Sequence, residues 1–467
     1  MSVASPSSSD PLEWSMAEAG ERLAAGELSP VELTEVYLAA IAERDDDVNA
    51  YLTVTADRAR ADAVRAEQEL RAGERRGPLH GVPVALKDLV ETAGIRTTGG
   101  SRILADNVPE RDAVLARNLR AAGTVLLGKT STHEYAYGGT SNNPHYGPTR
   151  NPWDRDRIPG GSSGGSAAAV VSGTAPGAVG TDTCGSVRIP AALCGCVGLK
   201  PTRGRVSLDG VLELAPSLDH GGPITRSVRD AALLLDAMSG TTTAGPAPDA
   251  GSPDLRGTTV GVPTSYFFEL VDPGVRAAVR ASLDLLADAG ATVREVEIGD
   301  LRPLVAAIFL RVRAEAQEVH RANFPSRRAD YGADLAENLS RPAPTAEQLE
   351  AADAVIATGV ASLLAAFEQV DVLATPTTPA TAPLIGAERV LVAGEDLHIE
   401  EMLTGFTSVF NAAGVPALTV PCGLVDGLPA GLQLVGPGGA ETTVLRVGAA
   451  YETLRGPASW PRSAATR

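Results

Sequence analysis

The sequence predicts an α/β fold, and three observations support this prediction. The chain has 467 residues, of which 44% are hydrophobic and 21% charged, so it can bury a large core. Short runs rich in β-branched residues alternate with segments whose apolar residues recur every three or four positions. Its 49 glycines and 33 prolines supply turns between these segments. We expect one domain built around a single sheet.

The first half begins with helices and continues with alternating strands and helices. Residues 11–76 have helical periodicity, and Ser29-Pro30 is typical of a helix start. Residues 81–86 form a short apolar run typical of a buried strand, which ends at Lys87. Next, the pattern predicts a helix at residues 112–122, a strand at residues 124–128 and a long loop at residues 137–165. A helix of small residues at 166–172 and a short strand at 178–180 follow.

A segment rich in Thr, Gly and Pro then divides the chain. We predict an N-terminal helical segment packed on the core at residues 1–76 and a core with the catalytic residues at residues 77–240. A connection at residues 241–256 then leads to residues 257–467, the second half of the same domain, which contributes the substrate pocket. In the second half, strands are expected at residues 258–262, 292–298, 370–376 and 417–421, and helices at residues 274–289, 304–323 and 346–367. The helix at residues 304–323 and a loop at residues 389–403 are expected to help build the pocket.

Composition argues against several classes of function. The formal charge of −17 and the pI near 4.9 do not favour direct binding to nucleic acid or to anionic lipid. Four cysteines without regular spacing predict free thiols in a reducing cytoplasm, and the six histidines show no metal-ligand spacing. Neither a signal peptide nor an apolar run long enough to span a membrane is recognisable.

The basic residues are 37 arginines and only three lysines, Lys87, Lys129 and Lys200. A lysine can lose its proton whereas an arginine cannot, so each retained lysine is a candidate for a special role. Lys129 is compatible with an ordinary surface position. Lys87 follows an apolar strand, which makes it the strongest candidate for a buried, functional amine.

The segment Gly160-Gly161-Ser162-Ser163-Gly164-Gly165-Ser166 has four possible interpretations. A flexible linker would have polar neighbours, but small apolar residues follow directly. A phosphate-binding loop would end in Lys-Ser/Thr and follow a strand, which this segment does not. A nucleophile elbow would also need a preceding strand. The fourth interpretation connects this loop to Lys87 and to a second serine-containing turn at residues 181–190.

Taken together, these motifs resemble the amidase signature family. The resemblance covers most of the chain and includes Lys87 at a strand end, the Gly-Ser loop, the turn Thr181-Asp182-Thr183-Cys184-Gly185-Ser186, and motifs at residues 151–154, 194–204, 371–379 and 431–437. It implies the amidase-signature fold, in which helices cover both faces of a central mixed, twisted β-sheet. Several linked motifs in the right order are far more specific than any single pattern.

The resemblance implies a Ser-Ser-Lys triad, with Ser186 as nucleophile, Ser162 as bridging serine after a cis peptide bond, and Lys87 as base. Elementary chemistry agrees, because a serine hydroxyl needs a neighbouring base and burial lowers the pKa of an ammonium. No metal or organic cofactor is required. Lys200 belongs to one of the family motifs and is expected to have a structural role.

The same resemblance implies an oxyanion hole of backbone N–H groups from residues Thr183, Cys184, Gly185 and Ser186. Cys184 departs from the Gly-Gly-Ser turn of many members and would be strained if that position required a positive φ. Ser163, Asp182 and Arg188 are expected to support the turn, although Arg188 has two interpretations, as a brace or as a binder of a substrate carboxylate. The residues His133, Tyr135, Tyr137 and Gly138 are weaker candidates for the pocket.

The leading prediction is a cytoplasmic amidase that cleaves the C–N bond of a small-molecule amide through an acyl-enzyme, with esters and carbamates as further plausible substrates. We therefore expect a small-molecule amide as partner, no direct binding to nucleic acid and no membrane. The sequence leaves the oligomeric state open, with a homodimer as one candidate. One alternative is the glutaminase-type A subunit of a tRNA-dependent amidotransferase. Such subunits commonly carry Arg-Gln-Pro where this chain has Arg188-Ile189-Pro190, which favours the stand-alone enzyme. The other alternative is a catalytically silent binding protein on the same scaffold.

Overall fold

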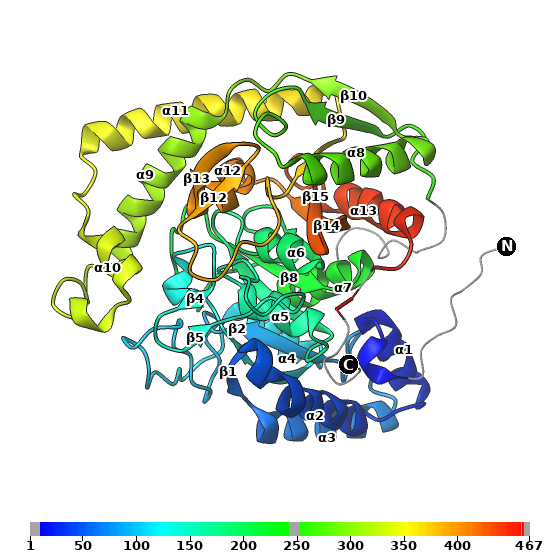
Figure 1. Ribbon diagram of the computed structural model, residues 1–467. Coiled ribbons are helices and arrows are strands. Elements are labelled where there is room, and N and C mark those ends of the chain that lie inside the picture. Colours follow the sequence, from blue (N-terminus) through cyan, green and yellow to red (C-terminus); the bar gives the residue numbers. More distant parts are fainter. Residues whose placement is uncertain (1–9, 242–252, 459, 462–467) are drawn as a thin grey trace.

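The computed structural model describes residues 10–241, 253–458 and 460–461. A mixed sheet of eleven strands runs through this part of the chain, in the order β1-β3-β2-β6-β8-β7-β14-β15-β11-β9-β10, and helices lie on both of its faces (Figure 1). This architecture confirms the predicted α/β fold.

The strands of the large sheet are β1 (Tyr51–Val54), β2 (Pro83–Lys87), β3 (Val125–Thr130), β6 (Gly177–Asp182), β7 (Val197–Lys200), β8 (His220–Thr225), β9 (Thr259–Pro263), β10 (Thr292–Val296), β11 (Val372–Pro376), β14 (Ala417–Val425) and β15 (Leu428–Val435). Two small hairpins consist of β4 (Asn142–Asn143) with β5 (Gly147–Pro148), and β12 (Arg389–Val392) with β13 (Glu395–His398).

The α-helices are α1 (Met16–Ala25), α2 (Pro30–Val48), α3 (Ala56–Arg71), α4 (Val114–Ala121), α5 (Gly164–Val171), α6 (Arg188–Cys194), α7 (Val228–Ser239), α8 (Pro273–Asp288), α9 (Arg302–Val319), α10 (Ala333–Ser340), α11 (Ala346–Ala365), α12 (Ile399–Ala412) and α13 (Glu441–Arg455). Short 3-10 turns are η1 (Pro11–Glu13), η2 (Glu134–Ala136), η3 (Arg328–Asp330) and η4 (Ala366–Glu368).

Sheet topology brings two distant motifs to one edge. β2 pairs in parallel with β6, with Ala85 opposite Ala178 and Leu86 opposite Val179. Parallel neighbours have their carboxyl ends at the same edge of the sheet. Lys87, at the end of β2, therefore lies beside the end of β6, where the turn that contains Ser186 begins. Ligand and catalytic sites of α/β sheets commonly form at such an edge.

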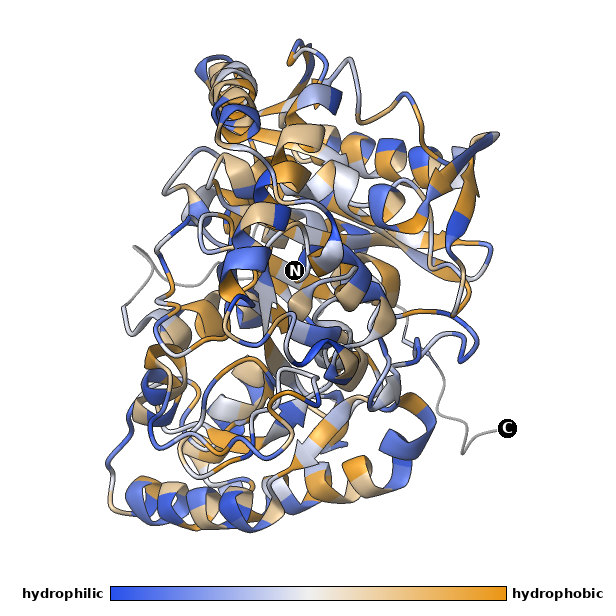
Figure 2. Ribbon diagram, turned by 90° about the vertical axis from the view of Figure 1, so that its left-hand side faces the viewer, coloured by the Kyte–Doolittle hydropathy of each residue, from blue (hydrophilic) through white to orange (hydrophobic). Residues whose placement is uncertain are grey.

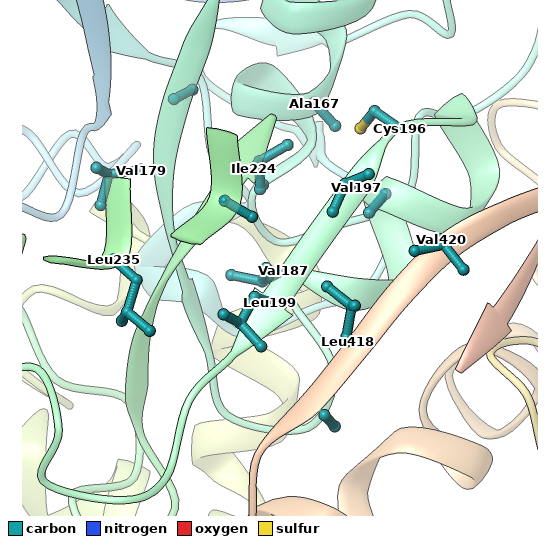
Figure 3. Close-up of a cluster of buried hydrophobic side chains, with 14 of the residues drawn as sticks. Ala167, Val179, Val187, Cys196, Val197, Leu199, Ile224, Leu235, Leu418 and Val420 are labelled. Carbon is teal, nitrogen blue, oxygen red and sulfur yellow. The ribbon is translucent and has the colours of Figure 1, made fainter. Parts of the chain in front are cut away.

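A continuous apolar core holds this edge in place. Figure 3 shows a part of it, in which Val179, Ile224, Leu199 and Leu418 lie close together on neighbouring strands. Valine, leucine and alanine fill the core, as the low aromatic content of 4% requires. The central strands, such as β2, β6 and β8, are buried on both faces, which explains why the sequences of β2 and β6 do not alternate between apolar and polar residues.

The outer helices are amphipathic, and Figure 2 shows them striped in hydrophilic and hydrophobic colours. The start of α2 has the cap that the sequence predicts. The Ser29 hydroxyl accepts a hydrogen bond from the Glu32 N–H, the Glu32 carboxylate accepts one from the Ser29 N–H, and Pro30 is the first helical residue.

The predicted connection at residues 241–256 lies largely outside the described residues, which stop at 241 and resume at 253. Strands from both sides of this gap belong to the same eleven-stranded sheet. The proposed division into segments stays a prediction.

One helix of the described chain is long and apolar enough, by length and composition alone, to cross a membrane. It comprises α11 and η4, residues Ala346–Glu368, and its most apolar window has a mean hydropathy of 1.6. In the structure it packs against α9. The sequence prediction identified this segment as an amphipathic helix, and a single helix of this kind is weak support for a membrane span.

Candidate active site

The amine of Lys87 lies between two hydroxyl groups. The side chain is fully buried, with its Nζ atom 2.7 Å from Oγ of Ser162 and 2.8 Å from Oγ1 of Thr181. Burial lowers the pKa of Lys87 to about 7, although the carboxylates of Asp182 and Asp219 oppose this shift. A substantial fraction of this amine is therefore uncharged near neutral pH, as a general base requires.

The other two lysines are also buried, but each has structural contacts. Lys129 donates hydrogen bonds to the Val90 carbonyl and to the Thr97 hydroxyl, and its Nζ lies 3.4 Å from a carboxylate oxygen of Asp88. It is thus not the surface residue that the sequence suggested. Lys200 donates to the carbonyl groups of Pro201 and Val415, in agreement with a structural role.

Ser162 lies in a loop that is fixed on several sides. The peptide bond from Gly161 to Ser162 is cis, as the family resemblance implies. The Ser162 carbonyl accepts hydrogen bonds from the His133 N–H and the Ser141 hydroxyl. The next hydroxyl, that of Ser163, donates to the Thr181 carbonyl and accepts from the Thr181 N–H. These contacts attach the loop to β6, directly beside Lys87.

Ser186 lies on the turn between β6 and α6. Its carbonyl accepts a hydrogen bond of 3.2 Å from the N–H of Ser163, so the two serine-bearing segments are adjacent. The Ser186 side chain is 7% exposed, in contrast to Ser162, which is fully buried. In the described part of the chain no group forms a hydrogen bond with the Ser186 hydroxyl, so this hydroxyl is available to a substrate.

Asp182 and Arg188 hold this turn from inside. The Asp182 carboxylate accepts from the N–H groups of Gly185 and Val187 and from the guanidinium of Arg188. Burial alone would raise the pKa of Asp182, but the Arg188 charge and hydrogen bonds outweigh it, and the pKa lies well below its usual range. Both side chains are fully buried. Of the two interpretations of Arg188, the structure therefore favours the brace.

Three further partners of Arg188 come from distant elements and were not identified from the sequence. The guanidinium donates to the Thr407 carbonyl, to Oδ1 of Asn411 and to Oε1 of Gln433. Gln433 belongs to the motif at residues 431–437, so its position in a family motif was a usable signal. Thr407 and Asn411 lie on an ordinary amphipathic helix, α12, and nothing in the sequence distinguishes them.

The turn leaves three N–H groups without a partner in the described chain, those of Thr183, Cys184 and Ser186. The N–H of Gly185, the fourth predicted donor, is instead bound to Asp182. Gly185 also carries the positive φ of the turn, +127°, whereas Cys184 is not among the residues with positive φ. The strain that a cysteine would suffer in a left-handed position is therefore absent.

The Cys184 thiol is a poor candidate for a nucleophile. Burial and the nearby carboxylates of Asp182 and Asp219 raise its pKa far above the ordinary range. The thiol therefore stays protonated at neutral pH and has little nucleophilic character. The carbonyl of the same residue accepts a hydrogen bond from the Thr407 hydroxyl, which fixes the turn against α12.

A cavity of about 1100 Å³ is lined by residues from both halves of the chain, and none of the described residues of the turn 181–188 or of the triad lines it. His133, Tyr137 and Gly138 line it, together with residues of α9, α10 and α12. Tyr135, the fourth predicted pocket residue, does not line it. Its ring packs edge-on against His320 at 4.5 Å instead.

His133 links this cavity to α10. Its Nε2 atom lies 2.8 Å from a carboxylate oxygen of Asp334. Burial disfavours the imidazolium, but the hydrogen bond and charge of Asp334, with Glu400 and Glu134 nearby, outweigh burial and raise the pKa of His133.

Comparisons with known proteins agree with this geometry. The family model described as Amidase matches residues 32–445. A relative from a Roseiflexus species, named as the A subunit of glutamyl-tRNA(Gln) amidotransferase, is 41% identical, and the match covers 95% of this chain and 96% of the relative. A solved amidase structure is 36% identical with a TM-score of 0.88, covering 94% of this chain and 99% of that chain. The solved structure of the same amidotransferase component from Thermotoga maritima is 32% identical with a TM-score of 0.79, covering 98% of this chain and 99% of that chain.

These findings correct two predictions. The preference for a stand-alone hydrolase of small-molecule amides is wrong, because the curated relatives that match from end to end, at 39–41% identity, are named as amidotransferase subunits. The expected partners, a small-molecule amide without nucleic acid or other protein, are wrong for the same reason. The net charge of one chain does not reveal which other proteins or nucleic acids an assembly with that chain would contain. None of these relatives is named as an esterase or a urethanase.

Proposed function

This chain belongs to the amidase signature family, an amidohydrolase family, and from that premise we propose that it is the glutaminase-type A subunit of a tRNA-dependent amidotransferase. The observation that carries this proposal is the end-to-end similarity to such subunits, 41% identity over 95% of the chain. In this role the chain hydrolyses the side-chain amide of glutamine, and partner subunits use the ammonia on a tRNA-bound substrate. A tRNA substrate supports a cytoplasmic location for the enzyme.

In the proposed reaction the Ser186 hydroxyl attacks the amide carbon, and its proton passes through the Ser162 hydroxyl to neutral Lys87. The contact of 2.7 Å between Lys87 and Ser162 supports the second part of this route. The Ser162 and Ser186 hydroxyls form no hydrogen bond with each other in the described chain, so this contact has to tighten when substrate binds, as is common for catalytic hydrogen bonds.

The tetrahedral intermediate carries a negative oxygen. The free N–H groups of Thr183, Cys184 and Ser186 are the donors that we assign to it. The C–N bond then breaks, the nitrogen takes a proton from Lys87 through Ser162, and ammonia leaves. Water resolves the ester between Ser186 and the glutamyl group by the same proton route, and glutamate is released.

The proposal is tested with the chain purified alone and together with the partner subunits of its native host. We expect the assembly to form glutaminyl-tRNA from glutamyl-tRNA with glutamine as the nitrogen source, and the Ser186→Ala assembly to do so only with added ammonia. A chain that forms no complex with partner subunits and hydrolyses simple amides but not glutamine would overturn the proposal.

A further inference from the structure

One face of α9 forms a wall of the cavity of about 1100 Å³. The lining residues Arg302, Val305, Ala306, Phe309, Leu310 and Arg313 recur at intervals of three and four, as expected for one helix face. Four of them are apolar. The two arginines lie at opposite ends of this stripe, and they differ in their partners.

Arg302 is paired with carboxylates, but Arg313 is not. Arg302 forms ion pairs with Glu269 and Asp300. The Arg313 guanidinium forms no hydrogen bond and no ion pair within the described chain, and its Nε atom is buried without a partner. A half-buried cation in this state has lost hydration without compensation.

The missing partner is unexpected in this protein, because acidic residues outnumber basic ones by 57 to 40. Five acidic side chains line the same cavity, Asp334, Glu337, Glu388, Glu400 and Glu401, and none of them pairs with Arg313 in the described chain. Asp334 pairs with His133, Glu337 with Arg341 at 3.6 Å, and Glu400 accepts a hydrogen bond from the Gly139 N–H. Arg311, two residues before Arg313 on the same helix, pairs with Asp353. Arg313 is therefore left free on the face that looks into the cavity.

Arg313 is also connected to the catalytic turn through Tyr137. Tyr137 lines the same cavity, and burial raises the pKa of its phenol, while Cys184 on the turn and the guanidinium groups of Arg341 and Arg313 are near enough to influence it. Cys184 immediately precedes Gly185 and Ser186 on the turn. A substrate that reaches from the turn along Tyr137 would thus bring its far end to the guanidinium.

We propose that Arg313 binds the carboxylate of the amide substrate and selects substrates with an anionic group at the end opposite the scissile amide. A guanidinium suits this role because its planar donors match the two oxygens of a carboxylate. The inference rests on the proposed function in that it names the acceptor for the carboxylate of a glutamine-like substrate at the same site.

The test uses two amides that differ only in that carboxylate, glutaramate and pentanamide. Both are assayed as substrates with the active chain and as ligands by calorimetry with the Ser186→Ala chain, which does not turn them over. We expect the Ser186→Ala chain to bind glutaramate at least tenfold more tightly than pentanamide. Arg313→Gln should lose between about 10-fold and 100-fold in affinity for glutaramate when combined with Ser186→Ala, and in kcat/KM for glutaramate in the active chain, since a charged hydrogen bond is removed.

Arg313→Gln should leave pentanamide hydrolysis within about threefold of wild type. For glutaramate, the kcat/KM of Arg313→Lys should lie between those of wild type and Arg313→Gln. Arg311→Gln is the matched control, because it removes a guanidinium of the same helix that pairs outside this stripe. It should leave the hydrolysis rates of both substrates unchanged. Equal losses for both substrates, unchanged selectivity, or equal binding of glutaramate and pentanamide by the Ser186→Ala chain would overturn the assignment. Failure of the proposed function would look different: glutaramate and pentanamide would still be discriminated, but glutamine would not be hydrolysed.

Discussion

Lys87 must be uncharged to accept a proton, and its surroundings favour that state. Burial lowers its pKa to about 7, so the amine is protonated at lower pH and free at higher pH. We expect kcat/KM for amide hydrolysis to rise with pH through about 7 and then level off. Lys87→Met should reduce kcat by ~1000-fold or more at every pH, as removal of a triad member does in serine hydrolases.

The control for this prediction is thermal unfolding. Lys87→Met removes a buried amine and should leave the fold intact. A pH profile that falls through pH 7, or a Lys87→Met enzyme with nearly normal turnover, would contradict the role of Lys87 as base.

Thr181 is a positioning residue that the sequence did not single out, although it belongs to the turn motif. Its hydroxyl lies 2.8 Å from the amine and is the second contact that orients Lys87 toward Ser162. Thr181→Val should lower kcat about tenfold with little change in KM, because one hydrogen bond to the base is lost. Thr181→Ser should restore kcat to within about threefold. Steady-state kinetics across pH measure this, and a Thr181→Val enzyme with an unchanged kcat would contradict the assignment.

Cys184 and Gly185 are adjacent but should respond differently to substitution by alanine. A Cβ atom on Gly185 would lie 2.1 Å from Oγ1 of Thr407, and the φ of +127° is unfavourable for any other residue. We expect Gly185→Ala to lower the free energy of unfolding by about 2–3 kcal/mol. Cys184→Ala should cost less than about 1.5 kcal/mol, since it only removes a sulfur. Chemical denaturation compares the two, and equal effects would contradict this account of the turn.

At the scale of elements, apolar runs predicted most of the sheet, but β1, β7, β8 and β15 were missed, and β8 has an identifiable cause. Residues 220–225 were not predicted as a strand, because two glycines and a proline favour a turn. These residues form β8, and the glycines are required by close packing: a Cβ atom on Gly222 would lie 2.1 Å from the Leu199 carbonyl oxygen. Tertiary contact thus decides a conformation that local propensity disfavours.

The predicted loop at residues 389–403 is instead the hairpin β12–β13 followed by α12. Ala393 and Gly394 separate the two strands, and both have positive φ, +49° and +93°. This is the conformation of a two-residue hairpin turn, but alanine is uncommon in its first position. Hairpin prediction from sequence relies on Asn-Gly or Asp-Gly, so this turn was missed.

The position of α10 should depend on pH. His133 and Asp334 attach α10 to the core, with Glu134 and Glu400 also facing the imidazole. The pKa of His133 is raised above the ordinary 6.5 when folded, so the stabilisation is complete below pH 6.5 and is lost as pH rises through the raised value. Amide hydrogen exchange in α10, corrected for intrinsic rates, should increase across this window. Asp334→Asn should abolish the dependence, and its persistence in that variant would contradict the pairing.

At the scale of the whole molecule, the motifs identified the family and predicted a triad, but one residue misled the choice within the family. Ile189, in place of glutamine, favoured a stand-alone enzyme. In the structure Ile189 is fully buried in an apolar cluster with Ile158, Leu193 and Leu403. A residue in such a position responds mainly to packing, so it is a weak indicator of substrate. Arg313 could not be identified either, because an unpaired arginine is recognisable only when its neighbours are known.

The most direct test of the central claim is the capture of the acyl-enzyme formed from glutamine. The chain, in complex with its partner subunits, is mixed with L-glutamine, quenched in acid and digested, and the peptides are analysed by mass spectrometry while ammonia is assayed in parallel. We predict a glutamyl ester on Ser186, which is absent in Ser186→Ala, together with release of ammonia. Ammonia release without an adduct on Ser186 in any quench, or no turnover of glutamine by the assembled enzyme, would contradict the account.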